Sequence, residues 1–160
     1  MTQEISDLAK KQRQAEINRV ALRMKLYYHG DPMKVQHFVR VYTLARSIGE
    51  LERLSDEEQE YLELAAIVHG IDADDPVAAV RDILRSCGVE EEVIMHVCHI
   101  VTNMNNFDHI STLEHQIFVE ARSIVDFKEN DITTDEIVKT AEKRFITNSG
   151  KLFLKRAFDV

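Results

Sequence analysis

The hydrophobic positions of this chain repeat with the spacing of amphipathic helices, and no stretch shows the strict alternation of a half-buried strand. In the first segment, Ile17, Val20, Ala21 and Met24 fall on one face. Polar or glycine-containing breaks separate the segments. We therefore predict helices over about 6–28, 32–51, 56–69, 76–87, 90–101 and 112–128, another that begins near 134, and a short one after Gly150.

Helix-start signals occur at these breaks. Asp31-Pro32 and Asp75-Pro76 each pair an N-cap aspartate with a proline at the first helical position. Three segments have the capping-box pattern of Ser or Thr followed by Glu three residues later: Ser55–Glu58, Ser111–Glu114 and Thr133–Glu136. The patterns predict an all-α fold in which residues 1–160 form a single domain.

The second and third predicted helices should lie at the centre of this fold. The second has two apolar faces, formed by Val35, Phe38, Val39, Tyr42 and Ala45 and by His37, Val41, Leu44 and Ile48. A helix that is apolar on two sides is enclosed by others. The third ends in an apolar run closed by His69 and Gly70. His37 and His69 are thus both predicted to lie on apolar faces of buried helices.

Composition narrows the functional classes. The 20 Lys and Arg against 28 Asp and Glu leave a net charge of −8, and an acidic surface repels nucleic acids. No apolar run approaches the roughly 20 residues of a membrane span, and the amino-terminal residues lack signal-peptide features. Cys87 and Cys98 form no recognisable pair. We expect a soluble, cytoplasmic protein with no nucleic-acid or membrane partner, and homo-oligomerisation is left open.

Several segments resemble the HD-domain superfamily of metal-dependent phosphohydrolases. The likeness covers 27–158 and is carried by the segments 37–42, 48–52, 64–69, 97–101, 116–121 and 144–150. The resemblance implies an HD-domain-like helical bundle. Members of this family hold a divalent metal with a His, a consecutive His-Asp pair and a distal Asp.

The match departs from the family where the metal would bind. His37 and His69 stand at the first two ligand positions, but Gly70 replaces the aspartate of the His-Asp pair and Arg122 replaces the distal aspartate. The histidines that follow the fifth helix in the branch most like this chain are here Thr102-Asn103-Met104-Asn105-Asn106. The Gly/Ser-rich insertion of that branch is also missing.

These replacements weaken metal binding for physical reasons. Hard divalent ions need several oxygen ligands, which two neutral imidazoles do not supply. Arg122 would place a fixed positive charge where the metal should lie. A guanidinium there can instead pair with a carboxylate or bind a phosphate or other small anion. For His37 and His69, metal coordination and hydrogen bonding within the bundle both remain open, and the missing carboxylates favour the second.

Two carboxylates are candidates to rescue the metal site. Asp72 follows His69 closely, but its carboxylate would have to bend back beyond the helix end. A solvated turn, in which Asp75 caps the next helix, is the favoured interpretation. Asp126 lies one turn after Arg122, but Leu113, Ile117, Ala121, Ile124 and Val125 define the core face of that helix. Asp126 lies nearly opposite this face, which predicts a surface carboxylate.

Two hypotheses follow. In the first, the chain is a degenerate HD-domain protein that has lost phosphohydrolase activity, needs no cofactor, and serves binding or regulation, with a small anionic ligand near Arg122, His37 and His69. In the second, it is a divergent phosphohydrolase that acts on a phosphoester or nucleotide and holds Mn, Mg, Fe or Zn with Asp72, Asp74 or Asp126 as rewired ligands. A plain protein–protein interaction module is a third possibility.

Overall fold

The computed structural model describes residues 2–160 and confirms the all-α prediction. Over this range it contains only helices and their connections, with no strand. The elements are α1 (Thr2–Tyr27), α2 (Pro32–Leu51), α3 (Asp56–Val68), α4 (Pro76–Ser86), α5 (Glu91–Thr102), a 3₁₀ turn (Phe107–His109), α6 (Leu113–Glu129), α7 (Thr134–Arg144) and α8 (Asn148–Phe158). No helix in this described range is both long and apolar enough to cross a membrane.

Most of the predicted helix starts are confirmed. Asp31 and Asp75 accept hydrogen bonds from the backbone N–H groups of Met33 and Ala78, and each is followed by a proline. Ser55 and Glu58 form a reciprocal capping box at α3. These caps satisfy N–H groups that have no partner within the helix.

Two predicted starts and one predicted cap are wrong. The first helix begins at Thr2 rather than near residue 6. At α6 the cap is Thr112, which accepts from the backbone of His115, so the Ser111–Glu114 pair makes no capping box. The last helix begins before Gly150, because the Thr147 hydroxyl accepts from the Gly150 N–H. In each case the helix begins or is capped at a residue close to the predicted one.

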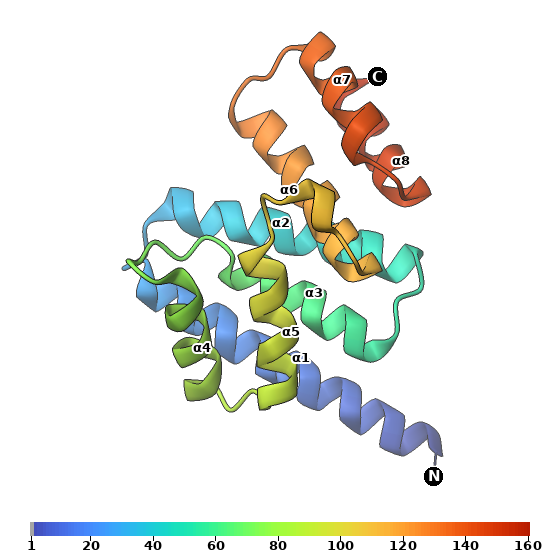
Figure 1. Ribbon diagram of the computed structural model, residues 1–160. Coiled ribbons are helices and arrows are strands. Elements are labelled where there is room, and N and C mark those ends of the chain that lie inside the picture. Colours follow the sequence, from blue (N-terminus) through green and yellow to red (C-terminus); the bar gives the residue numbers. More distant parts are fainter. Residues whose placement is uncertain (1) are drawn as a thin grey trace.

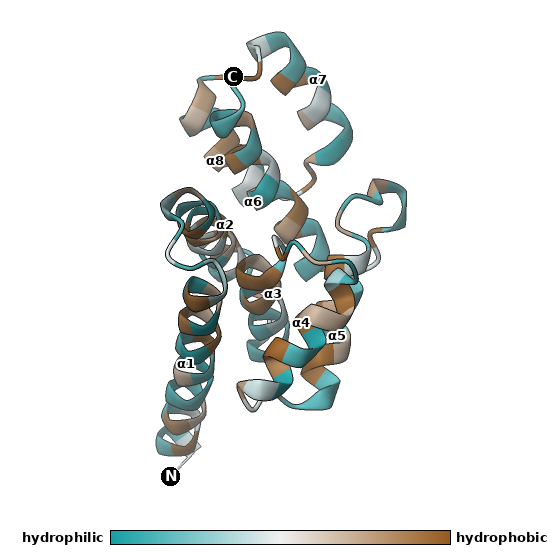
Figure 2. Ribbon diagram, turned by 90° about the vertical axis from the view of Figure 1, so that its left-hand side faces the viewer, coloured by the Kyte–Doolittle hydropathy of each residue, from teal (hydrophilic) through white to brown (hydrophobic). Residues whose placement is uncertain are grey.

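Helix α3 lies at the centre of the bundle. It packs against α1, α2, α5 and α6 (Figure 1), and every residue from Tyr61 to Val68 is buried. The hydropathy colouring shows hydrophobic residues along α3 and along α5, and the two helices pack together on an apolar face (Figure 2). Burial of this face, at roughly 25 cal/mol per Å² of apolar surface, is what drives the helices together.

The second helix is less enclosed than its sequence predicts. Phe38, Val41 and Ile48 are buried, but Val39 is 40% exposed and the His37 side chain is 26% exposed. The reason is that α3 and α6 pack on only part of the circumference of α2. His37 therefore lies at the boundary between the core and solvent, where its ring remains accessible.

The α7–α8 pair forms a separate layer at the top of the molecule (Figure 1). It has its own small core of Ile124, Phe127, Ile137, Phe145 and Leu154. Glu120 of α6, which is fully buried, joins this layer to the rest of the fold. Its carboxylate accepts hydrogen bonds from the backbone N–H groups of Ile146 and Thr147, from the Thr147 hydroxyl, and from the Gln116 amide.

Candidate functional site

His69 lies at the end of the buried helix α3, as its C-cap residue. Its ring is 5% exposed, and Nδ1 lies 2.8 Å from the carbonyl oxygen of Ala66. A carbonyl oxygen only accepts, so Nδ1 carries a hydrogen. Burial lowers the pKa of His69 to about 3, and the charge of Arg122 acts in the same direction. The ring is therefore neutral near pH 7 and presents a lone pair at Nε2.

His37 on α2 meets that lone pair. Its Nε2 lies 3.2 Å from Nε2 of His69, and its Nδ1 lies 2.8 Å from a Glu129 carboxylate oxygen. The Glu129 carboxylate only accepts, so Nδ1 of His37 carries the hydrogen on that side. The His37 ring is thus held between Glu129 and the Nε2 atom of His69. Arg40 donates to the other Glu129 oxygen at 3.2 Å and completes the network.

Arg122 of α6 turns into the site rather than away from it. Its side chain is only 14% exposed, and its guanidinium lies over the ring of Phe118, which also contacts the edge of the His69 ring. It donates to the Asn105 side-chain oxygen and lies 3.5 Å from an Asp126 oxygen. Burial lowers the pKa of Arg122, because these partners only partly replace water.

Asp126 is a partly exposed carboxylate at the edge of the site. Its side chain is 41% exposed, in keeping with the predicted surface position, but it also lies beside His37. Donor atoms of His37, Asp126 and Glu129 all lie within 4.8 Å of one another. The helical-wheel argument missed this proximity because α2 packs on α6 beside the Arg122–Asp126–Glu129 side, so a face outside the hydrophobic core still faces another helix. Burial raises the pKa of Asp126, which Arg122 and His37 partly oppose.

Gly70 and Asp72 lie close to the site in sequence but add no ligand to it. Asp72 is exposed, and only its backbone carbonyl has a partner, the Tyr27 hydroxyl. A Cβ built on Gly70 would lie 3.1 Å from the Tyr28 hydroxyl. The aspartate position of the family pattern is thus bordered here by a tyrosine, whose pKa burial raises to about 12.

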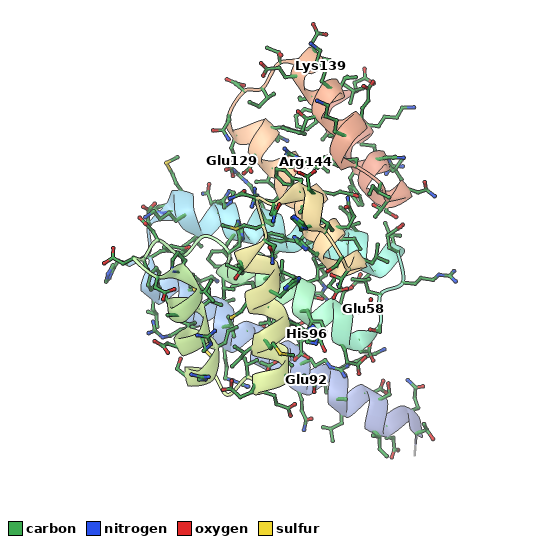
Figure 3. The ribbon with its side chains drawn as sticks, viewed as in Figure 1. Glu58, Glu92, His96, Glu129, Lys139 and Arg144 are labelled. Atoms are coloured by element: carbon green, nitrogen blue, oxygen red, sulfur yellow. The ribbon has the colours of Figure 1, made fainter. Side chains whose placement is uncertain are left out.

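Four site residues were missed by the sequence reasoning. Glu129 and Arg40 belong to the histidine network, and Asn105 binds Arg122. The fourth, Arg144, donates to the Ser123 hydroxyl, and its guanidinium lies 3.9 Å from the Phe107 ring centre. Figure 3 labels Glu129 and Arg144 where α6 enters the α7–α8 layer. The i, i+4, i+7 spacing of 122, 126 and 129 was the one sequence signal that could have pointed to Glu129.

The charges of this site are unbalanced. Arg122 and Arg144 lie close enough that the charge of Arg122 lowers the pKa of Arg144, after burial as the larger cause. The carboxylate of Asp126 acts on both guanidinium groups. The only other carboxylate of the network, Glu129, is already paired with His37 and Arg40. A chain of net charge −8 therefore collects an excess of positive charge here.

The donor set does not fit the divalent metal that the family resemblance implies. The Nε2 atoms of His37 and His69 converge, but no carboxylate oxygen completes that pair in place of the two missing aspartates. The nearest carboxylates are engaged with arginines and with Nδ1 of His37. A hard cation would also lie beside the fixed charge of Arg122.

Comparisons of this chain with protein-family models, with curated proteins and with solved structures find no match.

Proposed function

We propose that this protein is a degenerate HD-type bundle that has lost metal-dependent phosphohydrolase activity and uses the former metal site to bind a small anion. The observation that carries the proposal is the Arg122 guanidinium, which is held inside the site beside His69. A fixed cation at this point replaces the charge that a metal ion would provide, and it does not generate a metal-bound hydroxide for hydrolysis.

The proposed ligand is a phosphate or a similar small oxyanion. Guanidinium groups bind such anions through paired N–H donors. Arg122 and Arg144 share the carboxylate of Asp126, and burial lowers the pKa of both guanidinium groups. A bound anion would therefore balance the positive charge of both arginines. The Asn105 amide and the Ser123 hydroxyl are neighbouring groups that already bond to these arginines.

The first test of the proposal is metal content and turnover. Protein purified without chelators is expected to contain far less than one equivalent of Mn, Fe or Zn, and to leave phosphomonoesters and nucleotides intact when Mn²⁺ or Mg²⁺ is added. The variant G70D/R122D should gain metal binding. Because a Cβ at residue 70 meets the Tyr28 hydroxyl, the same pair of changes in a Y28F background should gain more.

The second test is anion binding. Titration with inorganic phosphate, followed by NMR, should shift the side-chain Nε–H signals of Arg122 and Arg144 in a saturable way. R122M should weaken the apparent Kd at least about tenfold, the loss expected for a charged hydrogen bond of about 1.5–3 kcal/mol. R156M, which alters an exposed arginine of α8, is the matched control. No saturable shift below about 50 mM phosphate contradicts the anion-binding proposal.

One observation favours the second candidate, a rewired phosphohydrolase. The donors of His37, Asp126 and Glu129 lie within 4.8 Å of one another and form a possible alternative set of metal ligands. Stoichiometric metal with turnover that is abolished in D126N and retained in D72N would establish this function and overturn the degenerate one. Because Asp72 is exposed and outside the cluster, it is the matched control.

A further inference from the structure

Helix α1 carries a second apolar stripe that the bundle does not use. Its core-facing side is formed by Ile17, Val20 and Met24. All of its remaining large aliphatic side chains are exposed: Ile5 is 68%, Leu8 56%, Leu22 59% and Leu26 62% exposed. At 100° per residue these four fall within one side of the helix, roughly opposite the buried face. We call the line through them the outer stripe.

The outer stripe has the spacing of a coiled-coil seam. Its positions alternate by three and four residues and are Ile5, Leu8, Gln12, Ala15, Arg19, Leu22 and Leu26. The seven positions have the a and d spacing of three heptads, about 31 Å of helix, and four of them hold large aliphatic residues. Every one of these residues is exposed. A helix that packs on only one face in a monomer has no need for such a line on its solvent side.

The amino-terminal turns of α1 also lack packing of their own. In both views this end of the helix extends past the other helices (Figures 1 and 2). Most residues from 2 to 12 are exposed, and Ile17 is the first buried side chain. A helix end without tertiary contacts is marginal in water. A partner that covers Ile5 and Leu8 would stabilise it.

We propose that the outer stripe binds the same stripe of a second copy, so that two α1 helices form an antiparallel coiled coil. A parallel pair would place Arg19 against Arg19 in the seam, a like-charge contact. In the antiparallel register Ile5 faces Leu22, Leu8 faces Arg19 and Gln12 faces Ala15. Arg19 already leans toward α4, where its Nε donates to the Cys87 carbonyl oxygen at 3.2 Å.

Charge complementarity supports the same register. In the antiparallel pair the flanking residue Glu4 of one copy faces Lys25 of the other, and symmetry makes this contact twice. Glu4 and Lys25 are both exposed and form no ion pair within the described chain. The unpaired charges at the two ends of α1 thus match each other across the proposed interface.

The test begins with sedimentation equilibrium of the full chain at 1–100 µM. A dimer is expected, and L8D/L22D should be monomeric with an unchanged circular dichroism spectrum, because both leucines are exposed. M33D is the control, since Met33 is 81% exposed but lies outside α1. A wild-type chain that stays monomeric at 100 µM overturns the proposal, as does a dimer that survives L8D/L22D.

Charge reversal tests the register. E4K and K25E should each weaken dimerisation by about 3- to 10-fold, as expected for two surface ion pairs, and the double variant E4K/K25E should recover it. Spin labels at residue 3, in a C87S background, should lie about 30 Å or more apart, since 21 residues separate residue 3 from the position opposite it. A label distance near 10–15 Å would indicate a parallel pair and overturn the proposed arrangement.

Discussion

At the scale of single residues, the site is defined by where its protons lie. The Ala66 carbonyl fixes the hydrogen of His69 on Nδ1, so the Nε2 lone pair of His69 points to the His37 ring. Glu129 requires a donor from Nδ1 of His37. These two acceptors place one hydrogen on Nδ1 of each histidine ring.

This proton assignment predicts an NMR signature. Nδ1 of His37 should show the ¹⁵N shift of a protonated nitrogen, and His69 should show one protonated nitrogen at Nδ1 and one unprotonated nitrogen at Nε2. E129Q should weaken the hydrogen bond at Nδ1 of His37, because an amide oxygen is a weaker acceptor than a carboxylate. E142Q, at an exposed site on α7, should change neither ring. An unprotonated Nδ1 in wild-type His37 would refute the assignment.

At the scale of secondary-structure elements, Glu120 holds α8 in place. It accepts two backbone N–H groups that precede α8, together with two side-chain donors, and it is fully buried. A Cβ on Gly150 would overlap its carboxylate oxygen, so glycine is required at 150 by this close approach. The apolar surface of the α7–α8 layer is small, which makes these polar contacts a large part of its attachment.

Replacement of Glu120 should therefore detach the α7–α8 layer. In E120Q one oxygen becomes an NH₂ group that faces N–H donors, and the expected loss is about 2–4 kcal/mol. Hydrogen exchange should rise across 145–158 while α3 stays protected. G150A should have the same local effect, and E142Q none. Uniform loss of protection in all helices would show instead that this layer unfolds together with the rest.

The helices themselves could be predicted well from the sequence, because each start is a local event. Asp31-Pro32, Asp75-Pro76 and the Ser55–Glu58 box supply their own hydrogen bonds, and periodicity located the core of α3.

The site was predicted less completely, because its contacts join distant segments. Asp126 was placed on the surface from the pattern of its own helix alone. Glu129 becomes a site residue only through its hydrogen bond with His37, which lies ninety-two residues earlier in the chain. Leu113, assigned to the core, is 42% exposed because α6 begins there.

At the scale of the whole molecule, two titrating groups act on stability in opposite directions as pH changes. His69 is buried, and burial lowers its pKa to about 3. Glu60 of α3 is half-buried, and its pKa is raised to about 8, first by burial and then by its hydrogen bond to Glu16. Each favours its neutral form in the folded state, so unfolding takes up a proton at His69 and releases one at Glu60.

The His69 contribution should appear at acid pH. Below pH 6.5 His69 binds a proton in the unfolded chain, whereas in the folded chain it stays neutral until about pH 3. The free energy of unfolding should therefore fall as the pH falls. The slope is at most about 1.4 kcal/mol per pH unit. Denaturant titrations of H69Q should lack this component, whereas H29Q, at an exposed histidine, should keep it. If H69Q fails to fold, proton uptake on unfolding, measured by calorimetry in two buffers, answers the same question.

The Glu60 contribution should appear in the opposite range. Between pH 4.5 and about 8 the folded state retains a proton that the unfolded state has released, so its contribution to the free energy of unfolding decreases as the pH rises. E60Q keeps the neutral hydrogen bond to Glu16 at every pH and should be more stable than wild type by a margin that widens up to pH 8, to about 1–2 kcal/mol after allowance for solvent screening. E57Q, an exposed neighbour on α3, should show no such widening.

The Glu16–Glu60 contact joins α1 to the central helix. A constant difference in the free energy of unfolding between E60Q and wild type from pH 5 to 9 would mean that these carboxyl groups do not share a proton. The attachment of α1 would then depend on its apolar face, the ion pairs of Arg13 and the hydrogen bonds of Arg19 and Tyr27.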